Sequence, residues 1–227
     1  MSASPAIAIA PRGSIPRGAV PFRVDILLLG LILGLCNLPL VFGGGTSDLS
    51  FQIAPVLAGE WWRLFTHPFA HVSWYHLLLD GAAFFGLYAN LLPGQPARRV
   101  FCLVASAFGS LAFALCFSPL IRLHGLCGLS GVAHGLMAVS ALELLTTRGT
   151  DRPTRVLAMC SLLGVTGKCL MECTTGHALF GAMHFGLIGT PILQCHAGGV
   201  LGGVTAFLLS RSSKREPNPH PTTCSAT

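Results

Sequence analysis

The segment Val100–Ile121, VFCLVASAFGSLAFALCFSPLI, contains 22 residues, and none of them is charged. A helix needs about 20 apolar residues to cross the hydrocarbon core of a bilayer. The whole chain shares this character, because 52% of its 227 residues are hydrophobic, 10% are charged and the mean hydropathy is +0.68. Soluble domains carry roughly 25% charged residues, which solvate their surfaces. The composition therefore predicts an integral membrane protein surrounded by the lipid bilayer.

Five further apolar segments flank this one, and the loops between them are short and rich in Gly, Pro and polar residues. Together they make six predicted transmembrane spans: Val24–Phe42, His76–Leu92, Val100–Ile121, Leu129–Leu145, Val156–Thr174 and Ile192–Ser210. The first exceeds the about 7–15 apolar residues of a cleaved signal peptide, which favours an uncleaved span. We therefore expect an all-α six-span bundle over residues 24–211. Residues 1–23 are an amino-terminal tail, and residues 212–227 are predicted to be disordered.

Lys and Arg are distributed unevenly between the two sides of this bundle. The tails and two loops on one side carry eleven of them: Arg12, Arg17, Arg23, Arg98, Arg99, Arg148, Arg152, Arg155, Arg211, Lys214 and Arg215. The other side carries Arg63 and Arg122, and Lys168 lies within a span. Since basic loops stay in the cytoplasm, both termini are predicted to be cytoplasmic. The formal net charge of +6 forms no cluster and predicts no nucleic-acid partner.

Three polar residues lie near the start of spans that this orientation runs inward from the outer face. His76 opens the second span, Ser130 opens the fourth, and His196 lies about one turn into the sixth. We expect all three in the same membrane leaflet. A serine hydroxyl needs a base to remove its proton, and a neutral imidazole is the usual one. Ser130 also lies at a helix amino terminus, where free N–H groups can stabilise an oxyanion.

Small residues accompany these polar ones. Pairs of glycines spaced four apart occur on both helices: Gly131 and Gly135, Gly199 and Gly203. Such faces let helices approach closely, which would bring Ser130 within reach of His196. His134, four residues after Ser130, is expected either to contact the serine or to stack beneath His196.

Charged residues within spans are costly in lipid and often functional. Asp80 follows His76 by four residues, on the same helical face. Lys168 and Glu172 form a second such pair in the fifth span, and mutual neutralisation within the bundle is one interpretation of it.

A metal site is a minority alternative. Several possible ligands fall on the outer side: His71, His76, Cys127, Cys195 and His196. The chain has no H-E-x-x-H motif and no carboxylate placed as the base of a metalloprotease. We predict no metal and no other cofactor, and interpret the nine cysteines as packing residues.

Four motifs resemble those of the rhomboid family of intramembrane serine proteases, in order and on the right spans. They are the run Trp62–Thr66, the set His71, His76 and Asp80, the run Gly128–Gly131, and the run His196–Gly199. The resemblance covers about Glu60–Gly203 and implies a six-helix fold. It also implies hydrolysis of membrane-anchored proteins in a depression open to the outer side.

The resemblance further implies the roles of individual residues. Ser130 and His196 would form a catalytic dyad without a third, acidic member. The Ser130 backbone N–H and the His76 side chain would bind the oxyanion, with His71 and Asp80 beside them. Four residues would support this arrangement: Gly128, Gly131, His134 and Gly199.

Asp80 departs from the family pattern, which commonly has Asn at this position. An ionised carboxylate would repel a developing oxyanion. Asp80 is therefore expected to be protonated, to be paired with His76, or to orient neighbouring groups instead of donating to the oxyanion.

Within the family the chain is most similar to the rhombosortases, a small bacterial branch. The features are the compact six-span size, the run Gly128–Gly135, Gly167-Lys168 with Glu172, and the spacing of His196 and Gly199. The branch implies cleavage near a carboxy-terminal Gly-Gly motif that precedes a membrane anchor, in the bacterial inner membrane. The acyl-enzyme could pass to water or to an amine.

Two other function classes stay open. A non-catalytic rhomboid-like protein would bind or chaperone membrane clients, but such proteins typically lose the serine or the histidine. A transporter or ion-binding bundle would distribute polar residues through the membrane depth, whereas these residues gather near one face. The sequence predicts no particular oligomeric state.

Overall fold

The computed structural model describes residues 23–93, 95–179, 181 and 185–212. Within them, six helices have at least 13 residues: α1 (Val24–Cys36), α5 (Trp74–Tyr88), α6 (Pro96–Phe117), α8 (Ser130–Thr146), α9 (Arg152–Thr175) and α10 (Gln194–Ser212). Short helical turns occupy the connections: α2 (Leu38–Val41), α3 (Ile53–Leu57), α4 (Arg63–Thr66), η1 (His67–Phe69) and α7 (Ile121–His124). The all-α prediction is confirmed.

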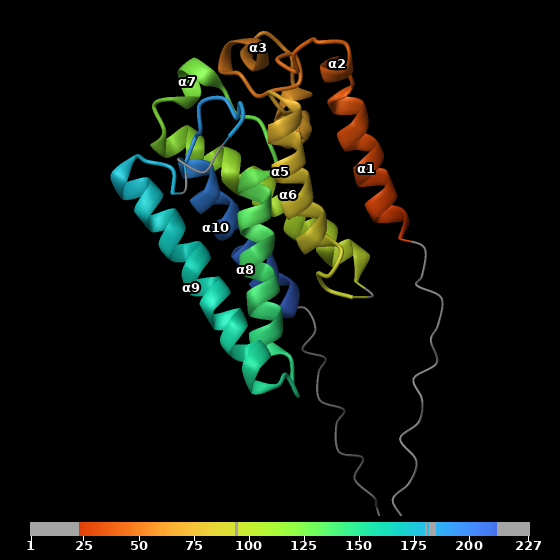
Figure 1. Cartoon of the computed structure of the whole chain (residues 1–227), viewed down its shortest axis with the longest axis vertical. Coiled ribbons are helices and arrows are strands. Elements are labelled where there is room, and N and C mark those ends of the chain that lie inside the picture. The colour runs from red at the N-terminus through yellow and green to blue at the C-terminus, as the bar shows by residue number, and fades with distance from the viewer. Residues whose placement is uncertain (1–22, 94, 180, 182–184, 213–227) are drawn as a thin grey trace, which may run out of the picture.

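The long helices alternate in direction (Figure 1). Helices α5, α8 and α10 run one way, and α1, α6 and α9 run the other way. Helix α10 packs most extensively against α6 and then against α8. The amino-terminal ends of α5, α8 and α10 consequently lie at the same end of the bundle.

The described helices follow the predicted spans closely, with local differences. Two of them, α6 and α9, are long and apolar enough to cross a membrane by length and composition, while α1 and α8 are apolar but shorter. Sequence signals mark the ends of α9: the Asp151 side chain caps its first turn, and Gly176 ends it in a left-handed conformation. The predicted tails 1–23 and 212–227 fall outside the described residues, except for Arg23 and for Ser212, which is the last residue of α10.

The first predicted span, Val24–Phe42, is not one continuous helix. It breaks at Asn37, between α1 and α2. Pro39 has no N–H for the helical bond to Leu35, and the Asn37 amide donates to the carbonyls of Leu33 (2.8 Å) and Phe69 (2.6 Å). The break thus ties α1 to the segment that precedes α5.

Glycines allow α10 to lie against its neighbours with backbones in contact. A Cβ added at Gly199 would overlap the Gly131 carbonyl oxygen of α8, and one added at Gly202 would overlap the Ala105 carbonyl oxygen of α6. Backbone atoms inside helices cannot move aside as a side chain can. The small-residue faces predicted from the glycine spacing therefore meet, and they hold the start of α10 beside the start of α8.

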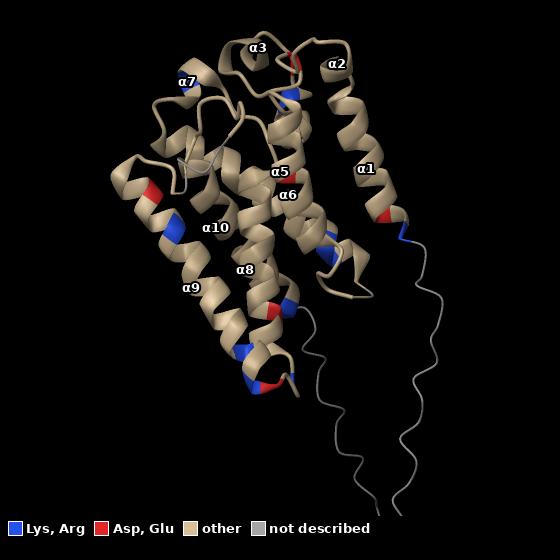
Figure 2. Ribbon diagram, viewed as in Figure 1, with Lys and Arg blue, Asp and Glu red and all other residues tan. Residues whose placement is uncertain are grey.

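The outside of the bundle is apolar along its length. Leucines of α1 and α9 are exposed, including Leu31 at 58% and Leu170 at 67%. Figure 2 shows Lys and Arg mainly toward the two ends of the bundle, with a largely uncharged stretch between them. Exceptions are Lys168 and Glu172 near the end of α9 and Asp80 within α5, and Glu172 is buried. Such a surface suits a lipid environment.

We expect Gly202→Ala to destabilise the protein, because the added methyl group overlaps the α6 backbone. Overpacking of this kind costs about 1–3 kcal/mol. Thermal unfolding of the purified protein in detergent measures the loss. The matched control is Gly164→Ala in α9, where an added Cβ meets no atom within 4 Å and the unfolding temperature should not fall. Equal unfolding temperatures for both variants would contradict this account of the packing.

Candidate active site

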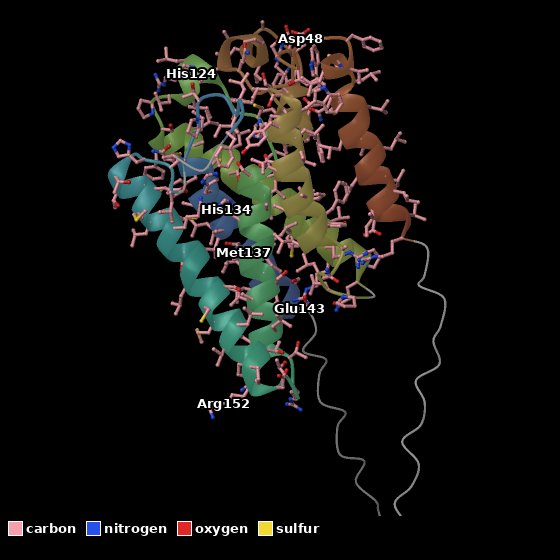
Figure 3. The ribbon with its side chains drawn as sticks, viewed as in Figure 1. Asp48, His124, His134, Met137, Glu143 and Arg152 are labelled. Atoms are coloured by element: carbon pink, nitrogen blue, oxygen red, sulfur yellow. The ribbon has the colours of Figure 1, made fainter. Side chains whose placement is uncertain are left out.

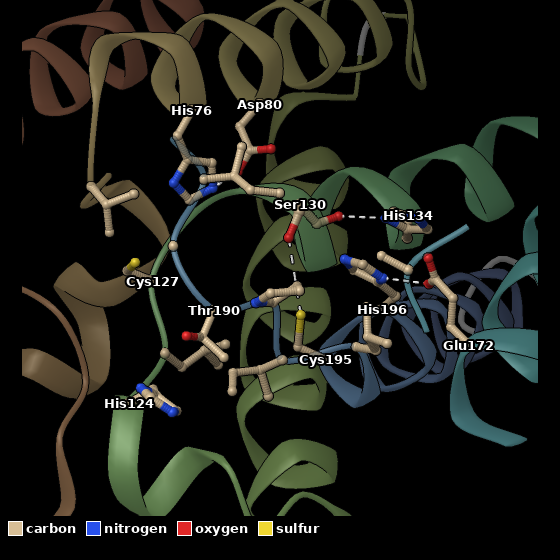
Figure 4. A pocket seen from close by; sticks show the side chains of 18 of the residues that line it. His76, Asp80, His124, Cys127, Ser130, His134, Glu172, Thr190, Cys195 and His196 are labelled. Atoms are coloured by element: carbon tan, nitrogen blue, oxygen red, sulfur yellow. Dashed lines mark hydrogen bonds and ion pairs between the residues drawn. The ribbon is translucent and has the colours of Figure 1, made fainter. Parts of the chain in front are cut away.

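A cavity of about 420 Å³ opens at the end of the bundle where α5, α8 and α10 begin (Figure 4). Polar residues of its lining come from the five helices α5, α7, α8, α9 and α10 and from the loop before α8: His76, Asp80, His124, Cys127, Ser130, His134, Lys168, Glu172 and His196. Five predicted site residues thus line one space: Ser130, His196, His76, Asp80 and His134. His71 lies behind this wall, fully buried, within ion-pairing distance of Asp80.

The loop that precedes Ser130 is held in place by backbone contacts. The Gly128 N–H donates to the His67 carbonyl at 3.0 Å, and Phe51 and Leu126 form an isolated antiparallel bridge. Gly128 has φ +99°, and a Cβ there would lie 2.8 Å from both the His76 Nε2 and the Asp80 Oδ2. Glycine is therefore needed both for the turn and for the close approach of the α5 side chains.

Ser130 is the first residue of α8. The earliest backbone bond across the start of this helix runs from the Ala133 N–H to the Leu129 carbonyl, at 2.8 Å. The Ser130 N–H therefore has no partner within the helix and lies at the positive end of the helix dipole. Among the described residues, the side chain within reach of the Ser130 Oγ is Cys195, whose Sγ lies 4.0 Å away.

His196 lies in the first turn of α10, and the sequence did not predict its contact with Glu172. Its Nδ1 is 2.7 Å from the Oε2 of Glu172, which is 1% exposed. The other carboxylate oxygen of Glu172 accepts from the Lys168 Nζ at 2.7 Å and from the Leu179 N–H at 3.1 Å. The spacing revealed the pair with Lys168 but not the contact with His196, because only the packing of α9 against α10 creates it.

His134 makes both contacts that the sequence offered as alternatives. Its ring stacks on that of His196, with centroids 4.1 Å apart and planes 12° from parallel. Its Nδ1 lies 2.7 Å from the Ser130 carbonyl oxygen, which can only accept, so Nδ1 carries the proton. Figure 3 shows His134 on the upper part of α8, far from Glu143 near the lower end of that helix.

Asp80 lies between two imidazoles. Its Oδ2 is 3.2 Å from the His76 Nε2 and 3.5 Å from the His71 Nε2. The His71 Nδ1 lies 3.1 Å from the Phe69 carbonyl and must donate to it. The Ser73 hydroxyl accepts from the backbone N–H of His76 at 3.1 Å and so caps the start of α5. Of the three roles expected for Asp80, pairing with His76 matches this geometry.

Two groups within the described chain have ligand atoms close enough to hold a metal ion. One is His71, His76 and Asp80, and the other is His134, Glu172 and His196, with ligand atoms within 4.8 Å of one another in each group. In the second group the Lys168 ammonium, 3.5 Å from the His196 Nδ1, already supplies a positive charge. The absence of a metal stays a prediction from the sequence, and the effect of a chelator on activity tests it.

Comparison with protein families bears on this arrangement. A family model described as Rhomboid domain matches residues 58–213, which is more than half of the chain. The chain belongs to the rhomboid family. Rhomboid proteins are intramembrane serine proteases and integral membrane proteins that act on membrane-protein substrates within the bilayer. A search of the curated proteins found no match. The matched region includes every residue of the predicted site, from His71 to Gly199.

We expect Asp80→Asn to keep most of the activity. An Asn side chain can place its amide oxygen at the position of the Asp80 Oδ2, where it accepts from the His76 Nε2. It places no negative charge beside an oxyanion. Asp80→Ala removes the acceptor beside the His76 Nε2. Loss of a hydrogen bond to a charged group costs about 1.5–3 kcal/mol, which corresponds to roughly a 10–100-fold fall in kcat. Cleavage kinetics in detergent measure both variants. Equal losses in the two variants would show that the carboxylate charge itself is required.

Proposed function

We propose that this rhomboid protein is a serine endopeptidase with Ser130 as nucleophile and His196 as general base. Its substrates are membrane-anchored proteins, cut near the outer face of the inner membrane at a carboxy-terminal Gly-Gly signal. The observation that carries the proposal is that Ser130 and His196 lie in the first turns of two adjacent helices and line one cavity together with His76.

The proposed chemistry uses groups that converge on this cavity. His196 accepts the Ser130 proton, and the Oγ attacks the scissile carbonyl to form a tetrahedral intermediate. The oxyanion lies near the free Ser130 N–H at the start of α8, with His76 on the facing helix α5. The imidazolium then returns its proton to the leaving amine, and water or another amine releases the acyl group from Ser130.

The Ser130 Oγ contacts the Cys195 sulfur in this structure and forms no hydrogen bond with His196 within the described chain. Serine χ1 has three staggered positions, and catalytic hydrogen bonds in enzymes without substrate are often long and tighten when the substrate binds. Attack therefore requires the Ser130 side chain to turn from Cys195 toward the imidazole.

The substrate class follows from two considerations. A protease binds extended backbone, and each Gly in a helix costs about 1 kcal/mol relative to Ala, so a Gly-Gly pair unwinds readily. The motif run Gly128–Gly135 and the pair Lys168 and Glu172 resemble the rhombosortase branch, which implies such signals. The basic residues gathered at the opposite end of the bundle support cytoplasmic termini and a cavity open to the outer side.

The test compares cleavage of a membrane reporter that carries a carboxy-terminal Gly-Gly and an anchor. The parent protein is expected to cleave it, and Ser130→Ala and His196→Ala are expected to lower the rate by at least about 10³-fold at equal expression. Cys195→Ala is the matched control for Ser130→Ala, since its sulfur contacts the Ser130 Oγ and it should stay active. A chelator should have no effect, and replacing Gly-Gly with Leu-Leu should abolish cleavage.

The outcomes separate the parts of the proposal. Cleavage that survives Ser130→Ala would eliminate the serine mechanism, and loss of activity with a chelator would favour a metal at one of the histidine groups. Labelling of the parent by a fluorophosphonate at Ser130, without cleavage of this reporter, would keep the mechanism and overturn the Gly-Gly substrate class. A parent that neither labels nor cleaves would favour the non-catalytic client-binding function.

A further inference from the structure

Glu172 lies near the end of α9, where it lines the cavity of the proposed active site. The side chain is 1% exposed, and a buried carboxylate is expensive unless it is paired and hydrogen-bonded. It has three partners, which are the Lys168 Nζ, the Leu179 N–H and the His196 Nδ1. Neutralising the charge of Lys168 requires only the contact with its Nζ. Charge neutralisation therefore does not explain why Glu172 also contacts the His196 Nδ1.

The two carboxylate oxygens of Glu172 contact different partners. Oε1 faces the Lys168 ammonium and the Leu179 amide, while Oε2 faces the imidazole alone. Two donors from α9 and the following loop thus hold the carboxylate in one orientation and favour its ionised form. The free oxygen is directed at a ring nitrogen of the proposed base.

We infer that Glu172 is a positioning residue for His196, which makes the catalytic group a Ser130–His196–Glu172 arrangement in place of a simple dyad. The inference rests on the proposed serine mechanism and adds a third member to it. Lys168 acts through Glu172, because it holds the carboxylate ionised and in place.

The proton positions follow from donor and acceptor rules. An ionised carboxylate only accepts, so the His196 Nδ1 must carry the proton that is shared with Glu172. The neutral imidazole then has its lone pair on Nε2, on the side of the ring away from Glu172. Figure 4 shows the His196 ring with its Nδ1 toward Glu172 and its other nitrogen on the side of Ser130. Glu172 therefore selects the tautomer that can remove the Ser130 proton.

The same contact matters after proton transfer. When the His196 Nε2 takes the proton from the Ser130 Oγ, the ring becomes an imidazolium and the oxyanion forms on the substrate carbonyl. Glu172 stabilises this cation and keeps its own charge throughout, so the proton stays on His196 until it passes to the leaving amine. The stacked ring of His134 holds the plane of the imidazole from one side.

The test compares four changes on the full-length protein in detergent. Glu172→Gln should lower kcat by about 10²–10⁴-fold with KM changed by less than about threefold, because a Gln amide can donate to Nδ1 and favour the wrong tautomer. Glu172→Asp keeps the acceptor and should recover at least about tenfold of that loss. Glu143→Gln, at a carboxylate that accepts from the Leu92 N–H near the other end of α8, should match the parent.

The double variant Lys168→Met with Glu172→Gln separates positioning from charge balance. If Glu172 served only to neutralise Lys168, removal of both charges would restore kcat to the parent value. We expect kcat to stay at the level of Glu172→Gln, and recovery would overturn the inference. A Glu172→Gln variant within threefold of the parent, while Ser130→Ala and His196→Ala are inactive, would also overturn it and leave the serine mechanism standing.

A measurement on the unaltered protein keeps the inference testable if the variants do not fold. In ¹⁵N-histidine spectra of the parent at neutral pH, assigned by comparison with His196→Ala, His196 should carry its proton on Nδ1. A proton on Nε2 would overturn the inference. Cleavage that persists in Ser130→Ala would instead overturn the serine mechanism itself.

Discussion

The contact of the α10 backbone with the backbones of α6 and α8 is the constraint on which the site depends. No hydrophobic force draws helices together in lipid, so close packing of small residues has to supply much of the attraction. At Gly199 and Gly202 any larger side chain would overlap a neighbouring carbonyl group. This approach sets how far His196 lies from Ser130, since each residue lies in the first turn of its helix.

The polar residues of the site lie in the first turns of helices, where backbone N–H groups need partners that lipid does not provide. Helix starts have N–H groups without intrahelical partners, and these groups would be costly in lipid. The structure gathers the starts of α5, α8 and α10 around one cavity, where His76, Ser130 and His196 lie. In the proposed mechanism, the same free N–H groups that would destabilise a lipid-exposed helix end supply donors for an oxyanion.

Both acidic side chains that line the site are paired with other polar side chains, as charges removed from water require. Glu172 contacts one ammonium and one imidazole, and Asp80 contacts two imidazoles. Each carboxylate therefore sits beside a histidine of the site, and each histidine is oriented by an acceptor. This pattern supports the positioning role that we propose for Glu172, because a pair made only for charge balance would need no contact with His196.

The sequence by itself determined the helical class, the approximate ends of most long helices and the order of the site residues. These follow from local properties: apolar length, capping residues such as Asp151, and glycine spacing. The tertiary structure alone decided the contact of Asn37 with the Phe69 carbonyl and that of Glu172 with His196, because the partners are 32 and 24 residues apart. Spacing along one helix predicts neighbours on that helix, whereas contacts between helices depend on how their faces are rotated when they pack.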